Sequence, residues 1–288
     1  MVYKEMFVER NQHRIYVRDY PGEEPAIILM HGFPDNLHLY DRLMPFLAPP
    51  RRVIAFDFLG WGASDKPAGY PYSASNQLGD LDAVITQLRL QQVILVAHDA
   101  SGPPAIDWAR DQSHRVAGLV LLNTYYCAMP MLRPPEAIWL FSTPMVRNIA
   151  RAVSAMFGHL IFRRIYQWQV GRFFRDAEVR DLFVPLLYQQ FDATPSARTA
   201  FFRLNEDLLP TIRSRSKELA KLREFRRPVR IIFGDADPYL NAGVARRFHE
   251  LFPWSELFLV RGARHFVQMD EPAQVAAFIL GMPRPGGE

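Results

Sequence analysis

The chain has 288 residues, of which 49% are hydrophobic and 22% are charged, and its formal net charge is +4. This composition excludes collagen-like, coiled-coil and intrinsically disordered chains, and the length suffices for one large domain with an insertion. The single cysteine, Cys127, excludes an internal disulfide framework and gives no sign of an oxidising compartment.

The N-terminal segment contains a charged residue every few positions, so it lacks the apolar core of a signal peptide. The longest uncharged apolar stretch in the middle of the chain, residues 152–162, is too short to span a bilayer. We therefore expect a cytoplasmic protein without a membrane span. Positive charge gathers between Arg147 and Arg227, but these arginines are scattered through apolar periodicity, which favours a solvated helical surface over a nucleic-acid site.

The first half of the chain alternates short apolar runs with helical patterns. The runs at residues 26–30, 52–56, 93–97 and 116–122 are apolar without alternation, which predicts strands that are buried on both faces. Between them, residues 75–88 place apolar side chains on one helical face. Strands that alternate with helices predict an α/β fold with a mostly parallel sheet and right-handed crossovers.

This alternation stops after Asn123. Residues 125–222 are helical, aromatic and interrupted by proline, with no convincing strand. The alternation then returns with two strands and two helices, in the order 229–233, 242–251, 256–260 and 272–280. We therefore expect one α/β core built from residues 1–124 and 223–288, with residues 125–222 as a helical insertion.

The strand expected at residues 93–97 runs into a helix across a turn of small residues. This is the context of a nucleophile elbow, a sharp turn in which the positions two before and two after the nucleophile must be small. These positions are Ala97 and Ser101 if Asp99 is the nucleophile, but Asp99 and Pro103 if Ser101 is. The elbow therefore predicts a carboxylate nucleophile rather than a hydroxyl.

An aspartate nucleophile restricts the substrate. Its attack on a saturated carbon forms an ester, which water can hydrolyse at the Asp99 carbonyl, whereas a serine would form an ether that histidine-activated water does not cleave. The sequence therefore favours displacement at saturated carbon, with an epoxide oxygen or a halide leaving. The structural alternative is that Asp99 only caps the following helix.

A tight loop, His31-Gly32-Phe33-Pro34, follows the strand expected at residues 26–30. At this place in the fold a loop can aim the Phe33 N–H at the nucleophile. Together with the Ala100 N–H, it would hold the oxyanion that forms when water attacks the ester. The Phe33–Pro34 bond is a candidate cis peptide.

Asp237 and His265 follow the last two expected strands. An acid after one strand and a histidine after the next complete the chain order of nucleophile, acid and base. Asp237 would fix the imidazole and His265 would activate the water, with Asp235 as the alternative acid. The other histidines lack metal-ligand spacing, so we expect no metal site and no cofactor, and His98 is expected to pack beside the nucleophile.

Together these residues resemble the α/β-hydrolase superfamily, in its aspartate-nucleophile branch of epoxide hydrolases and haloalkane dehalogenases. The resemblance covers nearly the whole chain and rests on His31-Gly32-Phe33-Pro34, on residues 57–67, on the Asp99 elbow, and on Asp237 and His265. It implies the α/β-hydrolase fold. It also implies that the helical insertion is a lid, which supplies donors to the leaving atom and excludes unwanted water.

The two enzyme families differ in these donors. A dehalogenase typically binds the halide with N–H groups from a Trp directly after the nucleophile and from an Asn or a lid Trp. In this sequence Ala100 directly follows the nucleophile, and Phe33 stands where the Asn is expected. Trp139 or Trp168 in the insertion is then left as a candidate donor to the halide. An epoxide hydrolase usually offers two lid tyrosines to the epoxide oxygen, and Tyr166 resembles the first of them.

Phe202 stands where the second tyrosine is expected, directly before an arginine. A phenylalanine cannot donate a hydrogen bond to the epoxide oxygen. Three alternatives follow: one tyrosine is enough, Tyr188 takes the place of the second tyrosine, or the epoxide assignment is wrong. From the resemblance we expect Phe202, Tyr188 and Trp168 to line the substrate site, together with His31 and Pro34.

The sequence thus predicts a hydrolase that opens epoxides to diols through an ester on Asp99. We expect a small hydrophobic substrate, no nucleic-acid partner, and a monomer or homodimer. The alternatives are a haloalkane dehalogenase with the same ester mechanism, a ligand-binding protein without catalysis, and a serine-type esterase. Gly60-Trp61-Gly62 lacks the third glycine and the helix opening of a dinucleotide site, and Tyr125 and Tyr126 are further candidates to face the cavity.

Overall fold

The computed structural model describes residues 2–48, 50–129, 131–157 and 159–283. In these ranges the strands form one eight-stranded sheet with the order β1-β2-β4-β3-β5-β6-β7-β8. The strands from β3 to β8 pair in parallel, whereas β2 pairs antiparallel with both β1 and β4. Their bounds are β1 (Lys4–Arg10), β2 (His13–Tyr20), β3 (Glu23–Met30), β4 (Arg51–Phe56), β5 (Val93–Asp99), β6 (Val116–Thr124), β7 (Val229–Gly234) and β8 (Ser255–Val260).

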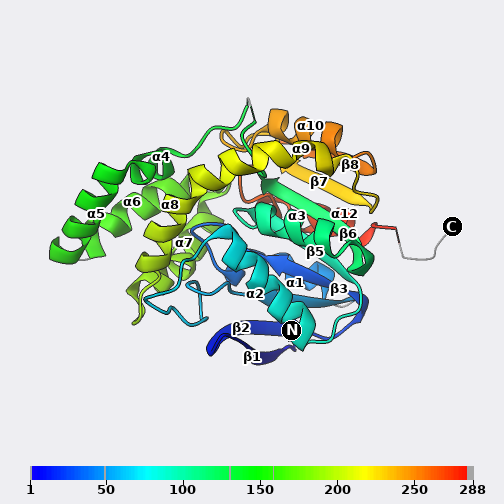
Figure 1. Cartoon of the computed structure of the whole chain (residues 1–288), viewed down its shortest axis with the longest axis horizontal. Helices are drawn as coiled ribbons and strands as arrows, with labels where there is room; N and C mark the ends of the chain where they lie inside the picture. Colours follow the sequence, from blue (N-terminus) through cyan, green and yellow to red (C-terminus); the bar gives the residue numbers. More distant parts are fainter. Residues whose placement is uncertain (1, 49, 130, 158, 284–288) are drawn as a thin grey trace.

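Helices cover both faces of this sheet. Figure 1 shows α2 and α3 on one face and α1 and α12 on the other. The α-helices are α1 (Met44–Leu47), α2 (Ala74–Gln87), α3 (Gly102–Asp111), α4 (Glu136–Ser142), α5 (Pro144–Phe157), α6 (His159–Gly171), α7 (Ala177–Asp192), α8 (Arg198–Arg215), α9 (Leu219–Leu222), α10 (Ala242–Leu251), α11 (Val267–Asp270) and α12 (Pro272–Leu280). Three short 3-10 helices are η1 (Leu37–Tyr40), η2 (Ser113–Arg115) and η3 (Ser216–Glu218).

The six strands predicted from apolar runs are all present, as β3 to β8. Strands β5 and β6 are buried along their whole length, as expected for the centre of a parallel sheet that is covered on both faces. This burial fixes the register of the two strands, and the register places Asp99 beside Thr124. The carboxyl ends of the central strands are thereby brought to one edge of the sheet.

The hairpin of β1 and β2 does not follow from the buried-run pattern, because only some of its residues face the core. Val8 of β1 and Ile15 and Val17 of β2 are buried, while the other residues of β1 are mostly exposed. Asn11 and Gln12 join the two strands with φ angles of 49° and 67°. Two successive residues with positive φ are typical of the tight turns that fit the twist of a hairpin.

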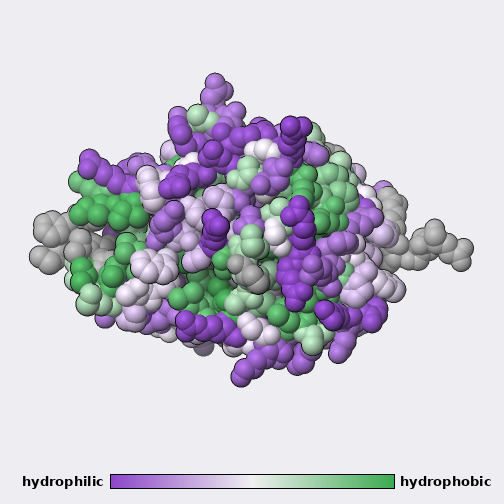
Figure 2. All heavy atoms as spheres, turned by 90° about the horizontal axis from the view of Figure 1, so that it is seen from above, coloured by the Kyte–Doolittle hydropathy of each residue, from purple (hydrophilic) through white to green (hydrophobic). Residues whose placement is uncertain are grey.

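Helices α4 to α9 lie between β6 and β7, which are neighbours in the sheet. In Figure 1, α4 to α8 form a separate layer at one end of the sheet. Apolar side chains are exposed on the outside of this layer, and Figure 2 shows hydrophobic residues gathered at that end of the molecule. None of the described helices combines the length and the apolar character needed to cross a membrane.

Candidate active site

Asp99 is the last residue of β5 and stands at a strained turn into α3. Its φ of 47° lies in the left-handed region, which a residue other than glycine adopts only at a cost that the surrounding structure must bear. Two glycines make room for the turn. A Cβ on Gly32 would lie 2.6 Å from the Asp99 Cβ, and one on Gly102 would lie 2.0 Å from Thr124 Oγ1. The chain is therefore built to present Asp99 at this point.

Ser101, the rival nucleophile, is turned into the core. Its side chain is fully buried, and its hydroxyl is within hydrogen-bond distance of the carbonyl oxygens of Met30 (2.9 Å) and His98 (2.8 Å). It also accepts a hydrogen bond from the His98 N–H at 2.8 Å. Ser101 thus stabilises the elbow and faces away from the cavity that Asp99 lines.

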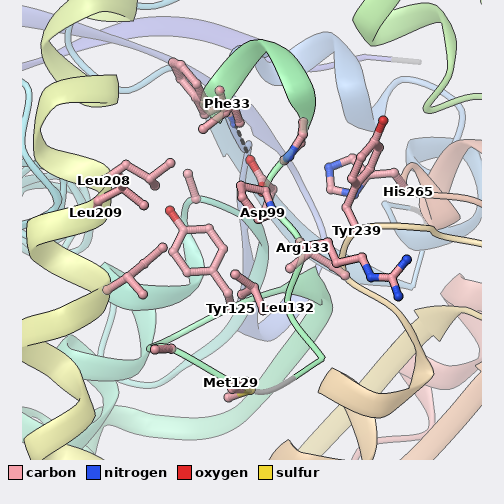
Figure 3. A pocket seen from close by; sticks show the side chains of 17 residues that line it. Phe33, Asp99, Tyr125, Met129, Leu132, Arg133, Leu208, Leu209, Tyr239 and His265 are labelled. Atoms are coloured by element: carbon pink, nitrogen blue, oxygen red, sulfur yellow. Dashed lines mark hydrogen bonds between the residues drawn. The ribbon is translucent and has the colours of Figure 1, made fainter. Parts of the chain in front are cut away.

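The loop after β3 brings a backbone donor to Asp99. The Phe33 N–H donates a hydrogen bond to Asp99 Oδ2 at 3.0 Å (Figure 3). The Phe33–Pro34 peptide is cis, as expected from the sequence. The amide of Ala100 also favours the ionised form of the Asp99 carboxyl. Both amides proposed for the oxyanion thus act on the same side chain.

His265 and Asp237 meet as their chain order predicts. His265 Nδ1 lies 2.8 Å from Asp237 Oδ2, and both residues are buried. Asp237 also accepts hydrogen bonds from the Tyr239 N–H at 2.8 Å and from Asn123 Nδ2 at 2.9 Å. The alternative acid, Asp235, is exposed and accepts a hydrogen bond from the Gly262 N–H instead.

The charges at the site are coupled. Burial raises the pKa of Asp99, against the effect of His265 and of the hydrogen bonds from backbone N–H groups. Burial lowers the pKa of His265, but its carboxylate neighbours, Asp237 first, outweigh burial and raise that pKa to about 9. Burial would also raise the pKa of Asp237, yet His265 and the hydrogen bonds lower it overall. The raised pKa of His265 and the lowered pKa of Asp237 favour an imidazolium beside the Asp237 carboxylate near neutral pH.

A cavity of about 200 Å³ opens onto Asp99 and His265. Figure 3 shows Tyr125 close to Asp99, and Leu208 and Leu209 of α8 forming the facing wall. Apart from Asp99, His265 and three further polar side chains, the lining is apolar. It consists of Phe33, Ala100, Tyr125, Ala128, Met129, Leu132, Arg133, Pro134, Pro135, Ile138, Leu208, Leu209, Ile212, Tyr239 and Leu240, with Asp99 and His265 at its base.

Tyr166 lies outside this lining. It is buried, and its hydroxyl donates a long hydrogen bond of 3.4 Å to the carbonyl oxygen of Pro34. Tyr166 and Pro34 line a second, smaller cavity of about 20 Å³, which shares Phe33 and Ile138 with the first. The structure therefore brings Tyr166 near the loop that carries Phe33 and not into the cavity of Asp99.

The other expected lining residues are also placed elsewhere. Phe202 and Tyr188 are buried in an aromatic cluster with Phe162. His31 is fully buried and accepts a hydrogen bond from the Phe58 N–H. Trp168 is 51% exposed on the outer surface. These side chains are absent from the described residues that line the main cavity.

Sequence reasoning missed Gln190, on α7. Its Nε2 donates to the carbonyl oxygens of Pro34 at 3.1 Å and Asp35 at 3.3 Å, and its Oε1 accepts from the Gly62 N–H at 2.8 Å. One buried side chain thus joins an inserted helix to two loops of the core. A glutamine among several polar residues of a helix carries no signal that would have singled it out.

Asp35 directly follows the loop of Phe33 and Pro34, and the sequence alone does not assign it a role. Its side chain is fully buried, and among the described residues neither carboxyl oxygen has a hydrogen-bond partner. Burial, and to a lesser degree the charge of Asp99, raises the pKa of Asp35 to about 8. A neutral carboxylic acid near neutral pH therefore lies close to the nucleophile.

The described residues include no group of three or more histidine, cysteine, aspartate or glutamate side chains that is arranged to hold a metal ion. The arrangement on which we base the chemistry consists of an acid–base pair, a carboxylate at a strained turn and an amide donor beside it. These groups can attack an electrophile and then activate a water.

Comparisons with known proteins identify the family and the fold. A family model described as alpha/beta hydrolase fold matches residues 25–272. The chain is 28% identical over 183 residues to a cis-3-alkyl-4-alkyloxetan-2-one decarboxylase from Shewanella oneidensis, covering 62% of this chain and 57% of that protein. This chain therefore spans less than two thirds of that relative. It is 24% identical over 282 residues to haloalkane dehalogenase 2 from Mycobacterium tuberculosis, covering 96% of this chain and 94% of that protein.

Among solved structures, the epoxide hydrolase CorEH superposes with a TM-score of 0.74 at 19% sequence identity, and the match covers 98% of each chain. At this level of identity the likeness shows the fold alone.

Proposed function

Because the chain belongs to the alpha/beta hydrolase fold family, we propose that it is a hydrolase that opens epoxides to diols through a covalent ester on Asp99. The observation that carries the proposal is the position of Asp99 at a positive-φ turn, where it lines one cavity with His265 and accepts a hydrogen bond from Phe33 N–H. A carboxylate held in this way is a nucleophile rather than a helix cap.

In the first half-reaction, an Asp99 oxygen attacks a ring carbon and the carbon–oxygen bond of the epoxide breaks. The negative charge moves from Asp99 to the departing oxygen. This oxygen then takes a proton from the His265 imidazolium, either directly or through a hydroxyl group that lies between them. His265 is thereby left neutral. The raised pKa of His265, about 9, supplies this proton at neutral pH.

In the second half-reaction, neutral His265 removes a proton from water while the water oxygen attacks the Asp99 carbonyl. Asp237 stabilises the imidazolium that forms, and the Phe33 and Ala100 amides hold the oxyanion. Collapse of the intermediate releases the diol and restores the Asp99 carboxylate and the imidazolium. The sum is one epoxide and one water converted to one diol.

An epoxide fits better than a haloalkane because of what the cavity offers to a leaving group. Trp139 and Trp168, the two candidate indole donors, are 63% and 51% exposed on the outside of the inserted helices. Among the described residues, no tryptophan or asparagine lines the cavity. A departing halide would therefore lack the N–H donors that the resemblance leads us to expect.

We further propose that residues 125–222 act as a lid over a core formed by residues 1–124 and 223–288. Residues of α4 and α8 line the cavity above Asp99. Phe173, which follows α6, packs on His265 with ring centroids 4.5 Å apart. These contacts would enclose an apolar substrate and limit the water at the ester.

The experiment that tests the function is intact-protein mass spectrometry of His265→Gln after incubation with candidate electrophiles. The panel holds a terminal epoxide, a bromoalkane of equal chain length and a cis-3,4-dialkyl oxetan-2-one, the compound class that names the Shewanella relative. The substitution removes both the base of the second half-reaction and the proton donor of the first. Ester formation should therefore be slower, with solvent water supplying the proton to the opened oxygen, but the ester should persist, so we expect the mass of the intact epoxide to be added to the chain.

The double variant Asp99→Ala, His265→Gln is the control and should take up no mass. An adduct with the bromoalkane alone would assign a dehalogenase, and an adduct that persists in the double variant would remove Asp99 from the mechanism. Absence of any adduct, with wild-type protein showing no turnover, would favour a ligand-binding role.

A further inference from the structure

The cavity that holds Asp99 contains few polar side chains besides the reacting pair. Among its described lining residues, the other side chains with polar atoms are Tyr125, Arg133 and Tyr239. The Tyr239 hydroxyl donates to Glu136 Oε2 at 2.8 Å and accepts from Gln169 Nε2 at 3.2 Å, so it is already engaged. Arg133 is exposed at the surface. Tyr125 is therefore the hydroxyl to consider.

Tyr125 directly follows β6, whose end is fixed against the nucleophile. Thr124 pairs with Asp99 in the sheet, and its hydroxyl donates to the Asp99 carbonyl oxygen. The next residue, Tyr125, is 6% exposed and lines the cavity. Its backbone position is thus determined by the same contacts that hold the elbow.

The hydroxyl of Tyr125 forms no hydrogen bond with the described part of the chain, in contrast to those of Tyr166 and Tyr239. Figure 3 shows it directed into the space between Asp99 and the wall formed by Leu208 and Leu209. Burial, followed by the charge of Asp99, raises the pKa of Tyr125 well above its usual value. The phenol therefore keeps its proton and is available as a donor to whatever occupies that space.

Resting on the function proposed above, we propose that Tyr125 donates the hydrogen bond that stabilises the departing epoxide oxygen. As the Asp99 oxygen forms its bond to the ring carbon, the ring carbon–oxygen bond breaks and its electron pair moves to the oxygen. Tyr125 O–H donates to this alkoxide. The alkoxide then takes its proton from the His265 imidazolium, either directly or through the Tyr125 hydroxyl, which is reprotonated. No other reactant is needed.

This assignment places the donor on the core rather than on the inserted helices. Tyr166 instead donates to the Pro34 carbonyl and lines the second cavity, which shares Phe33 and Ile138 with the first. The absence of a hydroxyl at Phe202 then has no consequence for the reaction, because that side chain packs in the aromatic cluster. A single core tyrosine does what the resemblance distributes over two residues of the lid.

The test measures ester formation in single-turnover experiments with an epoxide, in the His265→Gln background. In this background the second half-reaction stalls, and solvent water supplies the proton of the alkoxide in every variant that is compared. Tyr125→Phe should slow ester formation at saturating epoxide by about 100-fold, the effect typical of removing one oxyanion donor. The half-saturating concentration should stay within about threefold, because the ring that packs against the substrate is kept. Tyr166→Phe is the matched control and should change the rate by less than about threefold.

Incorporation of 3-fluorotyrosine at position 125 provides a second measurement that removes no group from the fold. A more acidic phenol is a stronger donor, so ester formation should accelerate. An unchanged rate in both Tyr125 variants, or a loss confined to Tyr166→Phe, would overturn the assignment. If wild-type protein gives no diol and His265→Gln gives no ester with the epoxide, the proposed function fails before Tyr125 is tested, so the two failures are distinguishable.

Discussion

The imidazole of His98 supports the loop that carries His265. His98 Nε2 lies 3.0 Å from the His265 carbonyl oxygen, and the two rings are 4.8 Å apart. Because a carbonyl only accepts, Nε2 carries the proton, and Nδ1 has no partner among the described residues. Burial lowers the pKa of His98 well below its usual value, so the ring remains neutral beside the imidazolium of His265.

Replacing His98 by Leu should impair the second half-reaction more than the first. The substitution keeps the volume roughly but leaves the buried His265 carbonyl unpaired, at a cost of about 1–3 kcal/mol in unfolding free energy. The loosened loop should slow ester hydrolysis, so ester should accumulate in the steady state. Urea unfolding and mass spectrometry during turnover give the two readouts. Equal slowing of both half-reactions would contradict a positioning role for His98.

Asp237→Asn should also trap the ester, by a different route. The Asp237 carboxylate is the largest of the influences that raise the pKa of His265, so its removal should lower that pKa. An asparagine that donates to His265 would also select the wrong tautomer for water activation. We expect ester hydrolysis to slow by about 10⁴-fold. A hydrolysis rate within tenfold of the wild type would argue that another acid, such as Asp235, supports the histidine.

The pH profile of ester formation should distinguish the two leaving groups. With an epoxide, the rate should rise as Asp99 ionises through its raised pKa, and fall as the His265 imidazolium deprotonates through a pKa of about 9. A halide needs no proton, so the alkaline decrease should be absent with a bromoalkane. Rapid-quench measurements between pH 5 and pH 10 would show this. An epoxide rate that stays constant above pH 9 would exclude His265 as the proton source.

Gln190→Ala should loosen the inserted helices from the core. It removes hydrogen bonds to Pro34, Asp35 and Gly62, which one side chain makes together. We expect faster amide hydrogen exchange in α7 and in the loop around Phe33, with about 1–3 kcal/mol lost in stability. Gln189→Ala, at the exposed neighbouring position of the same helix, should change neither. Equal exchange in the two variants would show that other contacts hold α7 in place.

Asp35 should make the folded protein less stable as the pH rises. Its pKa is raised from an unfolded value near 4 to about 8 by burial, so the folded state binds more protons than the unfolded state between these values. Stability from this group is complete below pH 4 and is lost as the pH rises through about 8. Urea unfolding of Asp35→Asn and Asp35→Ala should both show a flatter dependence on pH than the wild type. An unchanged slope would mean that Asp35 is solvated.

The sequence predicts the placement of the residues at the base of the site better than that of the residues in its walls. Asp99, Asp237 and His265 stand at strand ends, and parallel strands bring their carboxyl ends to one edge, so chain order is enough to place them together. The small residues around Asp99 also leave a local signal, because the turn needs them. These features depend on backbone geometry that short segments encode.

Which side chains form the walls of the cavity depends on how the inserted helices pack on the core. The spacing of apolar residues along a helix does not give that information. Tyr166 and Phe202 lie on helices whose aromatic residues face several directions, so their sequence positions do not say which cavity they line. The sequence makes Tyr125 only a candidate to face the cavity, because this residue lies just after a strand and outside any periodic pattern. The β1–β2 hairpin was missed for a related reason, since it lies at the edge of the sheet and buries few of its residues.

One wall of the cavity is fixed to the core along its length. Helix α8 carries Leu208, Leu209 and Ile212, and its Arg215 binds Asp107 on α3 through two hydrogen bonds of 2.9 and 2.7 Å. Its Asp207 accepts from the Ala74 N–H at the start of α2.

If the proposed function is right, we expect selectivity for the size of an apolar substituent to depend on this surface, which is held by the core and touches no reacting atom. A library that varies the three α8 side chains should therefore change the preferred length of the substrate, while the two half-reactions at Asp99 stay the same.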